Sequence, residues 1–165
     1  MYGICVSYAK NKDDAKDLLQ DGFIKVFNNL KKYSGGGNLQ GWIRRIIINN
    51  AIDAYRKKAR YSHIRIDLLD IDIDSLNGTN YSSSENEALK TLGKEDFLKI
   101  IEDLPEGYKM ILNLYIGENM THEEIADKLG IKAGTSKSQY FKAKKYLKDR
   151  IHKYVSKLTI SEYKK

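Results

Sequence analysis

The chain has 165 residues and a formal net charge of +7 at pH 7, from 29 lysines and arginines against 22 acidic residues. This length allows one domain or two small ones, and the positive charge favours a polyanionic partner such as nucleic acid. No apolar run is long enough for a membrane span, the N-terminus does not read as a signal peptide, and the single cysteine, Cys5, cannot form an internal disulfide, so we expect a cytoplasmic protein.

Residues 1–61 are predicted to form a first small domain made only of helices. Apolar residues recur at helical spacing from Asp13 to Leu30 and again from Trp42 to Arg60. Between them lies YSGGGNLQG, which begins at Tyr33 and whose three consecutive glycines predict a loop. The apolar face of the first long helix is predicted to include Leu18, Leu19, Ile24, Val26, Phe27 and Leu30. The second long helix carries a basic cluster of Arg44, Arg45, Arg56, Lys57, Lys58 and Arg60.

Residues 62–94 lose this helical periodicity and are predicted to form a flexible acidic linker. The stretch IRIDLLDIDID alternates isoleucine with aspartate, which is also compatible with a short strand, and Asn, Gly and Ser follow it. The polar composition favours a tether over a strand. Because basic segments lie on both sides of the acidic one, we expect two separate DNA-contacting modules.

Residues 95–158 are predicted to form a second helical domain with a helix-turn-helix. Pro105 lies at a helix start, where its missing N–H costs little. Thr121 and Glu124 have the spacing of a capping box, and Gly130 follows at a position typical of a helix end. Thr135 is expected to be the N-cap of the next helix. The second helix of such a motif enters the major groove of DNA.

The helix after Gly130 can be divided into two faces by steps of about 100° per residue. Residues expected to pack inward are Ser136, Tyr140, Ala143 and Leu147. Residues expected to face DNA are Lys137, Ser138, Phe141, Lys142 and Lys145. The alternative is an amphipathic surface helix whose lysines are only solvated.

The sequence shows no catalytic constellation, so we predict a protein that acts by binding and needs no cofactor or metal. His63, His122 and His152 lie far apart, and no Cys/His spacing suggests zinc. No GxxxxGK phosphate loop is present, and the acidic linker lacks the glycine and terminal glutamate of an EF-hand.

Four segments in this order resemble the extracytoplasmic-function (ECF) sigma factors, which are small promoter-specificity subunits of bacterial RNA polymerase. These are AKDLLQDGFIKVFNNL, GNLQGWIRRIIINNAIDAYRKK, LPEGYKMILNLYIGENMTHEEIADKLGI and GTSKSQYFKAKKYL. The resemblance covers nearly the whole chain and implies an all-α fold of two small domains. In the family a further helical stretch usually precedes the segment that begins here at Met1, so we expect a truncated or misassigned start. Ser136 replaces a usually apolar residue and Gln139 a common arginine.

The resemblance also implies three sets of contact residues. The minus-10 set, expected at the minus-10 promoter element, is Asn38, Leu39, Asn49, Asp53 and Arg56. The minus-35 set, expected at the minus-35 element, is Thr135, Lys137, Ser138, Phe141, Lys142 and Lys145. The polymerase set, expected on core RNA polymerase, is Asp17, Gln20 and Asp21. An anti-sigma factor is a further implied partner.

Three alternatives remain open from the residues alone. Asp53 and Arg56 have the spacing of an ion pair on a helix surface, which would leave them without a role at DNA. The whole chain could be a helix-turn-helix regulator that binds duplex DNA without polymerase. A metal-dependent nuclease that uses the acidic linker is the third alternative.

Overall fold

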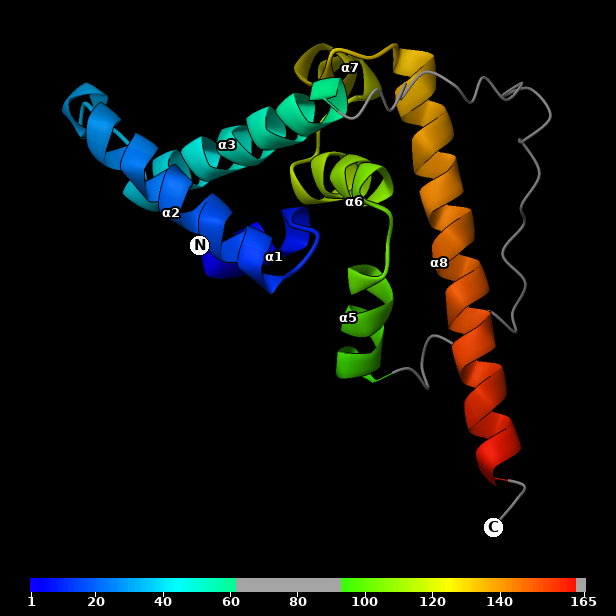
Figure 1. Ribbon diagram of the computed structural model, residues 1–165. Helices are drawn as coiled ribbons and strands as arrows, with labels where there is room; N and C mark the ends of the chain where they lie inside the picture. Colours follow the sequence, from blue (N-terminus) through cyan, green and yellow to red (C-terminus); the bar gives the residue numbers. More distant parts are fainter. Residues whose placement is uncertain (62–92, 163–165) are drawn as a thin grey trace.

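The computed structural model describes residues 1–61 and 93–162, and the regular structure within those ranges is entirely helical (Figure 1). The first lobe, residues 1–61, contains α1 (Tyr2–Tyr8), α2 (Lys12–Asn29), a 3-10 turn (Leu30–Lys32) and α3 (Leu39–Tyr61). The second lobe, residues 93–162, contains α5 (Lys94–Glu102), α6 (Glu106–Leu112), a π-helical turn (Asn113–Gly117), α7 (His122–Leu129) and α8 (Ala133–Glu162). The predicted linker, including its strand alternative, lies outside the described residues except at its last positions.

The two long helices of the first lobe begin where short polar side chains cap them. The side chain of Asn11 accepts a hydrogen bond from the backbone N–H of Asp14 at 2.8 Å and so starts α2. The side-chain oxygen of Asn38 accepts from the N–H groups of Gln40 at 2.9 Å and Gly41 at 3.3 Å. This cap starts α3 at Leu39, three residues earlier than the periodicity predicted.

The core of the first lobe lies where α1 and α2 meet α3. Cys5, Ala15 and Ile47 are each at most 1% exposed, so the thiol of the single cysteine is buried. Burial raises the pKa of the Cys5 thiol. Gly22 of α2 lies directly against Ile47, and this close approach draws the two long helices together.

One expectation for α2 was wrong. Ile24, Phe27 and Leu30 are 52%, 69% and 49% exposed, although the periodicity placed them on the buried face. The side of α2 that meets α3 presents Val26, as expected, together with Gly22, and both are buried. The apolar character of these residues was therefore not enough to tell which side of α2 is buried.

The second lobe has the predicted helix-turn-helix. Thr121 and Glu124 form the expected capping box, and Gly130 adopts the left-handed conformation with φ 69°. Pro105 is the N-cap of α6, as its position suggested. Thr135 is not an N-cap, because α8 already begins at Ala133. The N–H of Ser136 bonds to the carbonyl of Lys132 at 3.1 Å, so Thr135 lies inside the first turn.

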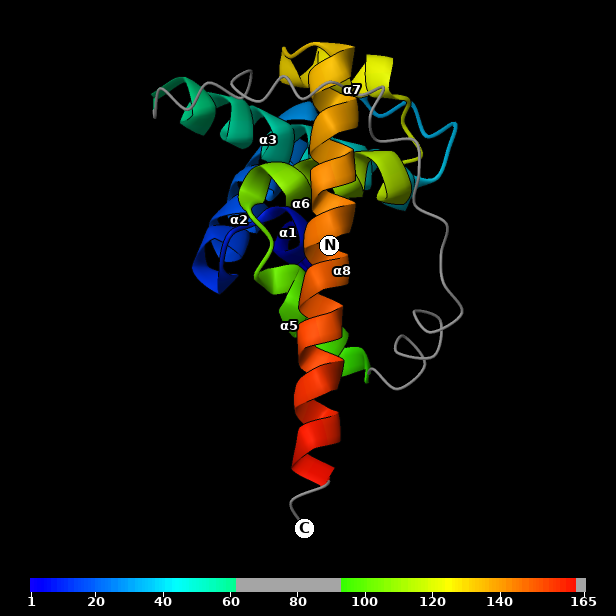
Figure 2. The same ribbon diagram turned by 90° about the vertical axis from the view of Figure 1, so that its right-hand side faces the viewer.

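The long helix α8 extends past α6 and α5, as Figures 1 and 2 show from two directions. Ala143 is fully buried and packs with Leu104 and Leu112, and Tyr140 and Leu147 lie partly buried against them. This contact confirms the predicted inward face of α8.

The two lobes also pack against each other, which the sequence did not predict. Their buried residues form one cluster, in which Tyr8, Ile48, Ala51 and Ile52 of the first lobe meet Met110, Ile111, Leu114, Ile125 and Leu129 of the second. Apart from this cluster, the Lys109 ammonium, on a residue 3% exposed, donates to the carbonyls of Ala9 and Glu102, both at 3.2 Å.

We predict opposite effects from adding a methyl group at two helical glycines. A Cβ at Gly22 would lie 3.0 Å from Cγ1 of Ile47, whereas one at Gly134 would meet nothing within 4 Å. Gly22→Ala should destabilise the fold, because overpacking of about 1–3 kcal/mol exceeds the gain in helix propensity of about 1 kcal/mol. Gly134→Ala should stabilise it by about 0.5–1 kcal/mol. Thermal melts of both variants test this, and a higher melting temperature for Gly22→Ala would refute the close packing.

Candidate nucleic-acid interface

The turn of the helix-turn-helix is held by backbone hydrogen bonds and a ring cluster. The N–H groups of Gly130 and Ile131 both bond to the carbonyl of Ala126, at 2.8 and 3.0 Å. Nδ1 of His122 lies 2.9 Å from the Ser136 hydroxyl, which joins the start of α7 to the first turns of α8. These contacts fix the angle at which α8 leaves the turn.

An aromatic cluster supports the same turn. The ring of Tyr115 stacks on His122 and also meets Tyr140, with both pairs of centroids 4.5 Å apart. Burial lowers the pKa of His122, the nearby Lys137 lowers it further, and Glu123 opposes the shift. His122 is therefore a packing residue in its neutral form.

The members of the minus-35 set do not all face outward. Lys137 and Lys145 are exposed, and Phe141 and Lys142 are half-buried. The expectation that Ser138 projects away from the protein was wrong, because it is 5% exposed and donates to the carbonyl of Thr135 at 3.0 Å. Its short hydroxyl turns back on the helix, and Thr135 is itself only 7% exposed. The Lys142 ammonium is also shielded, which lowers its pKa, and it bonds to none of the described residues.

The minus-10 set lies on α3 and the loop before it. Asn38 uses its side-chain oxygen as the cap of α3, and Leu39 beside it is 45% exposed. Asn49 is exposed and accepts a hydrogen bond from the Lys128 ammonium of α7 at 3.3 Å. At the loop itself, the rings of Tyr33 and Trp42 pack with centroids 5.3 Å apart.

On α3, Asp53 forms an ion pair, but its partner is not Arg56, as the alternative interpretation of the sequence had it. Asp53 pairs with Lys25 of α2 at 3.3 Å, and both side chains remain largely exposed. Arg56 is half-buried, and Asp53 pairs with Lys25 rather than with it. Asn49, Asp53 and Arg56 still share one side of α3, since they are spaced at i, i+4 and i+7.

The polymerase set is exposed along one side of α2, and apolar residues continue the same row; we call this row the exposed stripe of α2. Asp17, Gln20 and Asp21 are all exposed, and Ile24 and Phe27 follow them at helical spacing. Sequence reasoning missed the two apolar members because it assigned them to the core. Their spacing from Asp17 was the signal that could have identified them.

Within residues 1–61 and 93–162, no three His, Cys, Asp or Glu side chains are grouped in a way that would hold a metal ion. No helix in those ranges has the length and apolar character needed to cross a membrane.

Comparison with known proteins relates both lobes to one family. The model for sigma-70 region 2 matches residues 1–61, and that for sigma-70 region 4 matches residues 94–147. The ECF RNA polymerase sigma factor SigE of Mycolicibacterium smegmatis is 30% identical over 94% of this chain, which spans 59% of that relative's length. RNA polymerase sigma factor SigV of Bacillus subtilis is 28% identical over 92% of this chain and 84% of the relative.

A solved structure shares the fold. The sigma factor RpoE of Bartonella quintana, determined in complex with the anti-sigma factor NepR, has a TM-score of 0.52 to this chain. The two share 22% sequence identity, and the match covers 92% of this chain and 89% of that one.

We predict that the helix-turn-helix loses stability as the pH falls through the range in which the His122 imidazole takes up a proton. The folded pKa of His122 lies below its unfolded value of 6.5, so the unfolded chain binds the proton more readily. Stability is therefore full above pH 6.5 and falls toward the folded pKa.

His122→Gln keeps a side chain that can bond to Ser136 but removes the titration. Melting temperatures measured between about pH 7.5 and 5.5 should fall less for this variant than for the native chain. Parallel curves for both would show that His122 is not held in its neutral form.

Proposed function

Because this chain belongs to the ECF group of the sigma-70 family, we propose that it directs core RNA polymerase to specific promoters and starts transcription by recognising and melting them. The observation that carries the proposal is the pair of matched regions in family order, each with exposed residues suited to its task. The chain works by binding, with no chemistry of its own, and it acts in the cytoplasm, where the polymerase is.

Polymerase binding uses the exposed stripe of α2. Asp17, Gln20 and Asp21 offer charge and hydrogen bonds, and Phe27, 69% exposed, offers an apolar anchor. A partner surface with basic residues around an apolar pocket fits this combination, since charge steers the encounter and buried apolar contact holds the complex.

Promoter melting uses the loop before α3 and the exposed side of that helix. An opened strand is stabilised when extruded bases are captured and the backbone is held by cations. Asn49 offers both donors and acceptors to a base edge, and Arg56 offers a phosphate contact. Leu39, 45% exposed beside the glycine loop, offers an apolar surface to an unstacked base.

Minus-35 recognition uses α8, whose first turns enter the major groove. Lys137 and Lys145 are exposed and suited to phosphate, and Phe141 to a thymine methyl group. Lys142 reads a base or a phosphate once its ammonium is uncovered. Thr135 and Ser138, both buried here, contribute through the helix N-terminus and its backbone more than through their hydroxyls.

An anti-sigma factor is the third proposed partner, after core polymerase and promoter DNA. The solved relative from Bartonella quintana is bound to one, and this supports a partner of the same kind here.

Charge reversal on α2 tests the polymerase surface. Asp17→Lys combined with Asp21→Lys should abolish co-elution with core polymerase of the same species in gel filtration, because like charges would then meet. The same change at Asp127 and Asp149, both exposed and both in the second lobe, is the matched control. A native chain that folds but never co-elutes would refute the sigma-factor function and favour a regulator that works without polymerase.

Lys142→Ala tests the minus-35 surface. In the assembled holoenzyme it should weaken binding by about 1–3 kcal/mol on the preferred sequence if Lys142 reads a guanine. If Lys142 meets phosphate only, the loss should be equal on all sequences and the salt slope should fall by about one unit.

Leu147→Ala is the contrasting variant, since Leu147 packs against the second-lobe core and should cost about 2–5 kcal/mol of stability. DNA affinity at several salt concentrations, paired with melts, separates these outcomes. If Lys142→Ala unfolds the domain while Leu147→Ala leaves its stability unchanged, the inward and DNA-facing sides of α8 have been assigned the wrong way round.

A further inference from the structure

The glycine loop before α3, residues 33–38, is closed by the side chain of Tyr33. The hydroxyl of Tyr33 donates to the carbonyl of Gly37 near the other end of the loop. Its ring packs on Trp42 in the first turn of α3, with the two centroids 5.3 Å apart. One side chain therefore joins the start of the loop both to its end and to the helix that follows. Figure 1 shows this loop at the end of α3 farthest from α7.

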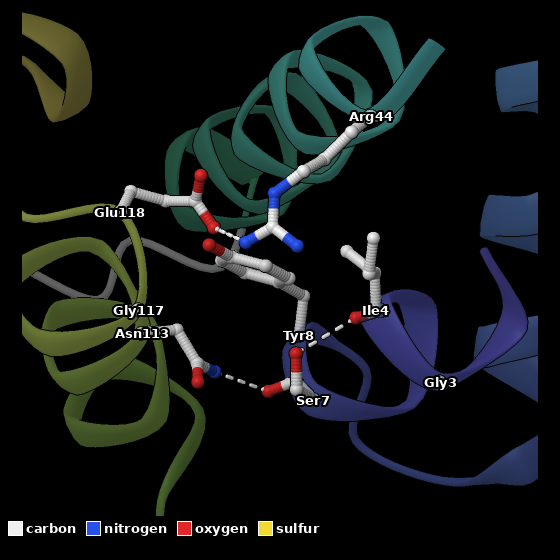
Figure 3. Close-up of a pocket in the computed structure, with 8 residues that line it drawn as sticks. All are labelled: Gly3, Ile4, Ser7, Tyr8, Arg44, Asn113, Gly117 and Glu118. Atoms are coloured by element: carbon white, nitrogen blue, oxygen red, sulfur yellow. Dashed lines mark hydrogen bonds and ion pairs between the residues drawn. The ribbon is translucent and has the colours of Figure 1, made fainter. Parts of the chain in front are cut away.

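The segments on either side of the loop are held by contacts of their own. Before it, the backbone N–H of Tyr33 bonds to the carbonyl of Leu30 at 3.1 Å, which ends the 3-10 turn. After it, Arg44, two residues beyond Trp42, pairs with Glu118 of the second lobe, as Figure 3 shows. Because both flanks are fixed independently, the conformation of the loop depends on the contacts made across it.

Ordering of this loop is costly because of its glycines. Gly35, Gly36 and Gly37 have no side chains that could pack, and glycine loses more backbone freedom on ordering than any other residue. Gly35 adopts the left-handed conformation with φ 74°, which disfavours most other residues at that position. The two contacts of Tyr33 offset this cost in the chain that has not yet met DNA.

The end of the loop carries two members of the minus-10 set. The side-chain oxygen of Asn38 caps α3, and Leu39 directly after it is 45% exposed. Both follow Gly37, which accepts the hydrogen bond of Tyr33, so closure of the loop fixes the backbone from which they project. A site that is ordered before binding loses less conformational entropy when its ligand arrives, and it therefore binds more tightly.

We propose that Tyr33 is a positioning residue for promoter melting. It holds the glycine loop in the conformation that receives an unstacked base of the opened minus-10 strand, and it acts through Asn38 and Leu39 without touching the base. Without the Tyr33 hydroxyl the loop should be open in a larger fraction of molecules, and only the closed fraction binds the strand well. This inference rests on the proposed function, since only a chain that melts promoters meets such a base.

Fluorescence of the free chain tests whether Tyr33 orders the loop. Trp42 is the only tryptophan of the chain, so its emission reports on this loop alone. Tyr33→Phe keeps the ring but removes the hydroxyl, and it should make Trp42 more accessible to a soluble quencher such as acrylamide. The matched control is Tyr146→Phe, which removes a hydroxyl that donates to the carbonyl of Asp103 in the second lobe. The control should leave the quenching of Trp42 unchanged.

Binding of the assembled holoenzyme to two DNA probes tests the role at the promoter. Both probes derive from one promoter that the native holoenzyme selects from a randomised library. In the first probe the minus-10 element is held open by mismatches, and the second is a duplex that ends upstream of that element. Tyr33→Phe should weaken binding to the opened probe by about two- to ten-fold, as expected for the loss of one hydrogen bond. Binding to the upstream duplex should be unchanged, and Tyr146→Phe should leave the ratio of the two affinities as it is.

A second substitution in the same loop should restore part of the loss. Gly37 has its φ outside the left-handed region, and a Cβ there would meet nothing within 4 Å. Gly37→Ala added to Tyr33→Phe should therefore restrict the open loop and recover about two- to five-fold in affinity for the opened probe. Gly35→Ala in the same background should weaken binding further, because alanine is strained at φ 74°.

Equal quenching of Trp42 in the native chain and in Tyr33→Phe would overturn the positioning role, as would equal affinity of the two for the opened probe. An equal loss on both probes would assign Tyr33 to folding alone and would also overturn it. A native holoenzyme that does not bind the opened probe would overturn the proposed function and this inference with it, while the quenching data would still show whether Tyr33 orders the loop.

Discussion

The buried ammonium of Lys109 is the contact on which the arrangement of the lobes depends. It donates to Ala9, where α1 ends, and to Glu102, where α5 ends, so it joins the C-termini of two helices from different lobes. Both termini carry partial negative charge, which suits a cation. Desolvation lowers the pKa of Lys109, and the neighbouring carboxylates of Glu102, Glu106 and Asp103 oppose this shift. Because an unpaired buried charge is costly, these two hydrogen bonds favour the arrangement in which α1 and α5 both end beside Lys109.

This constraint links the fold to the proposed activity. The surfaces suited to polymerase on α2 remain exposed, whereas part of the surface suited to DNA on α3 is engaged by the second lobe. The residues proposed to bind polymerase are accessible in the described structure, and Asn49, one of those proposed to bind the minus-10 element, is already hydrogen-bonded to Lys128.

What the sequence predicted well was local. The capping box at Thr121, the left-handed Gly130 and the glycine loop before α3 depend only on neighbouring residues, and each was predicted. The errors arose where contacts between residues far apart in the sequence determine the structure. Thr135 is inside α8 because that helix starts earlier, and Phe27 is exposed because α2 turns a different side toward α3. The shared core of the lobes joins residues about 60 or more positions apart, for which one sequence carries no signal.

Run-off transcription from a library of randomised promoters tests the central claim most directly. Core polymerase of the same species should produce few defined transcripts alone and a discrete set when this chain is added. Sequencing of those templates should give two conserved elements, one for each lobe. Transcription that is unchanged by the chain, with core polymerase active on a control promoter and sigma factor, would contradict the account.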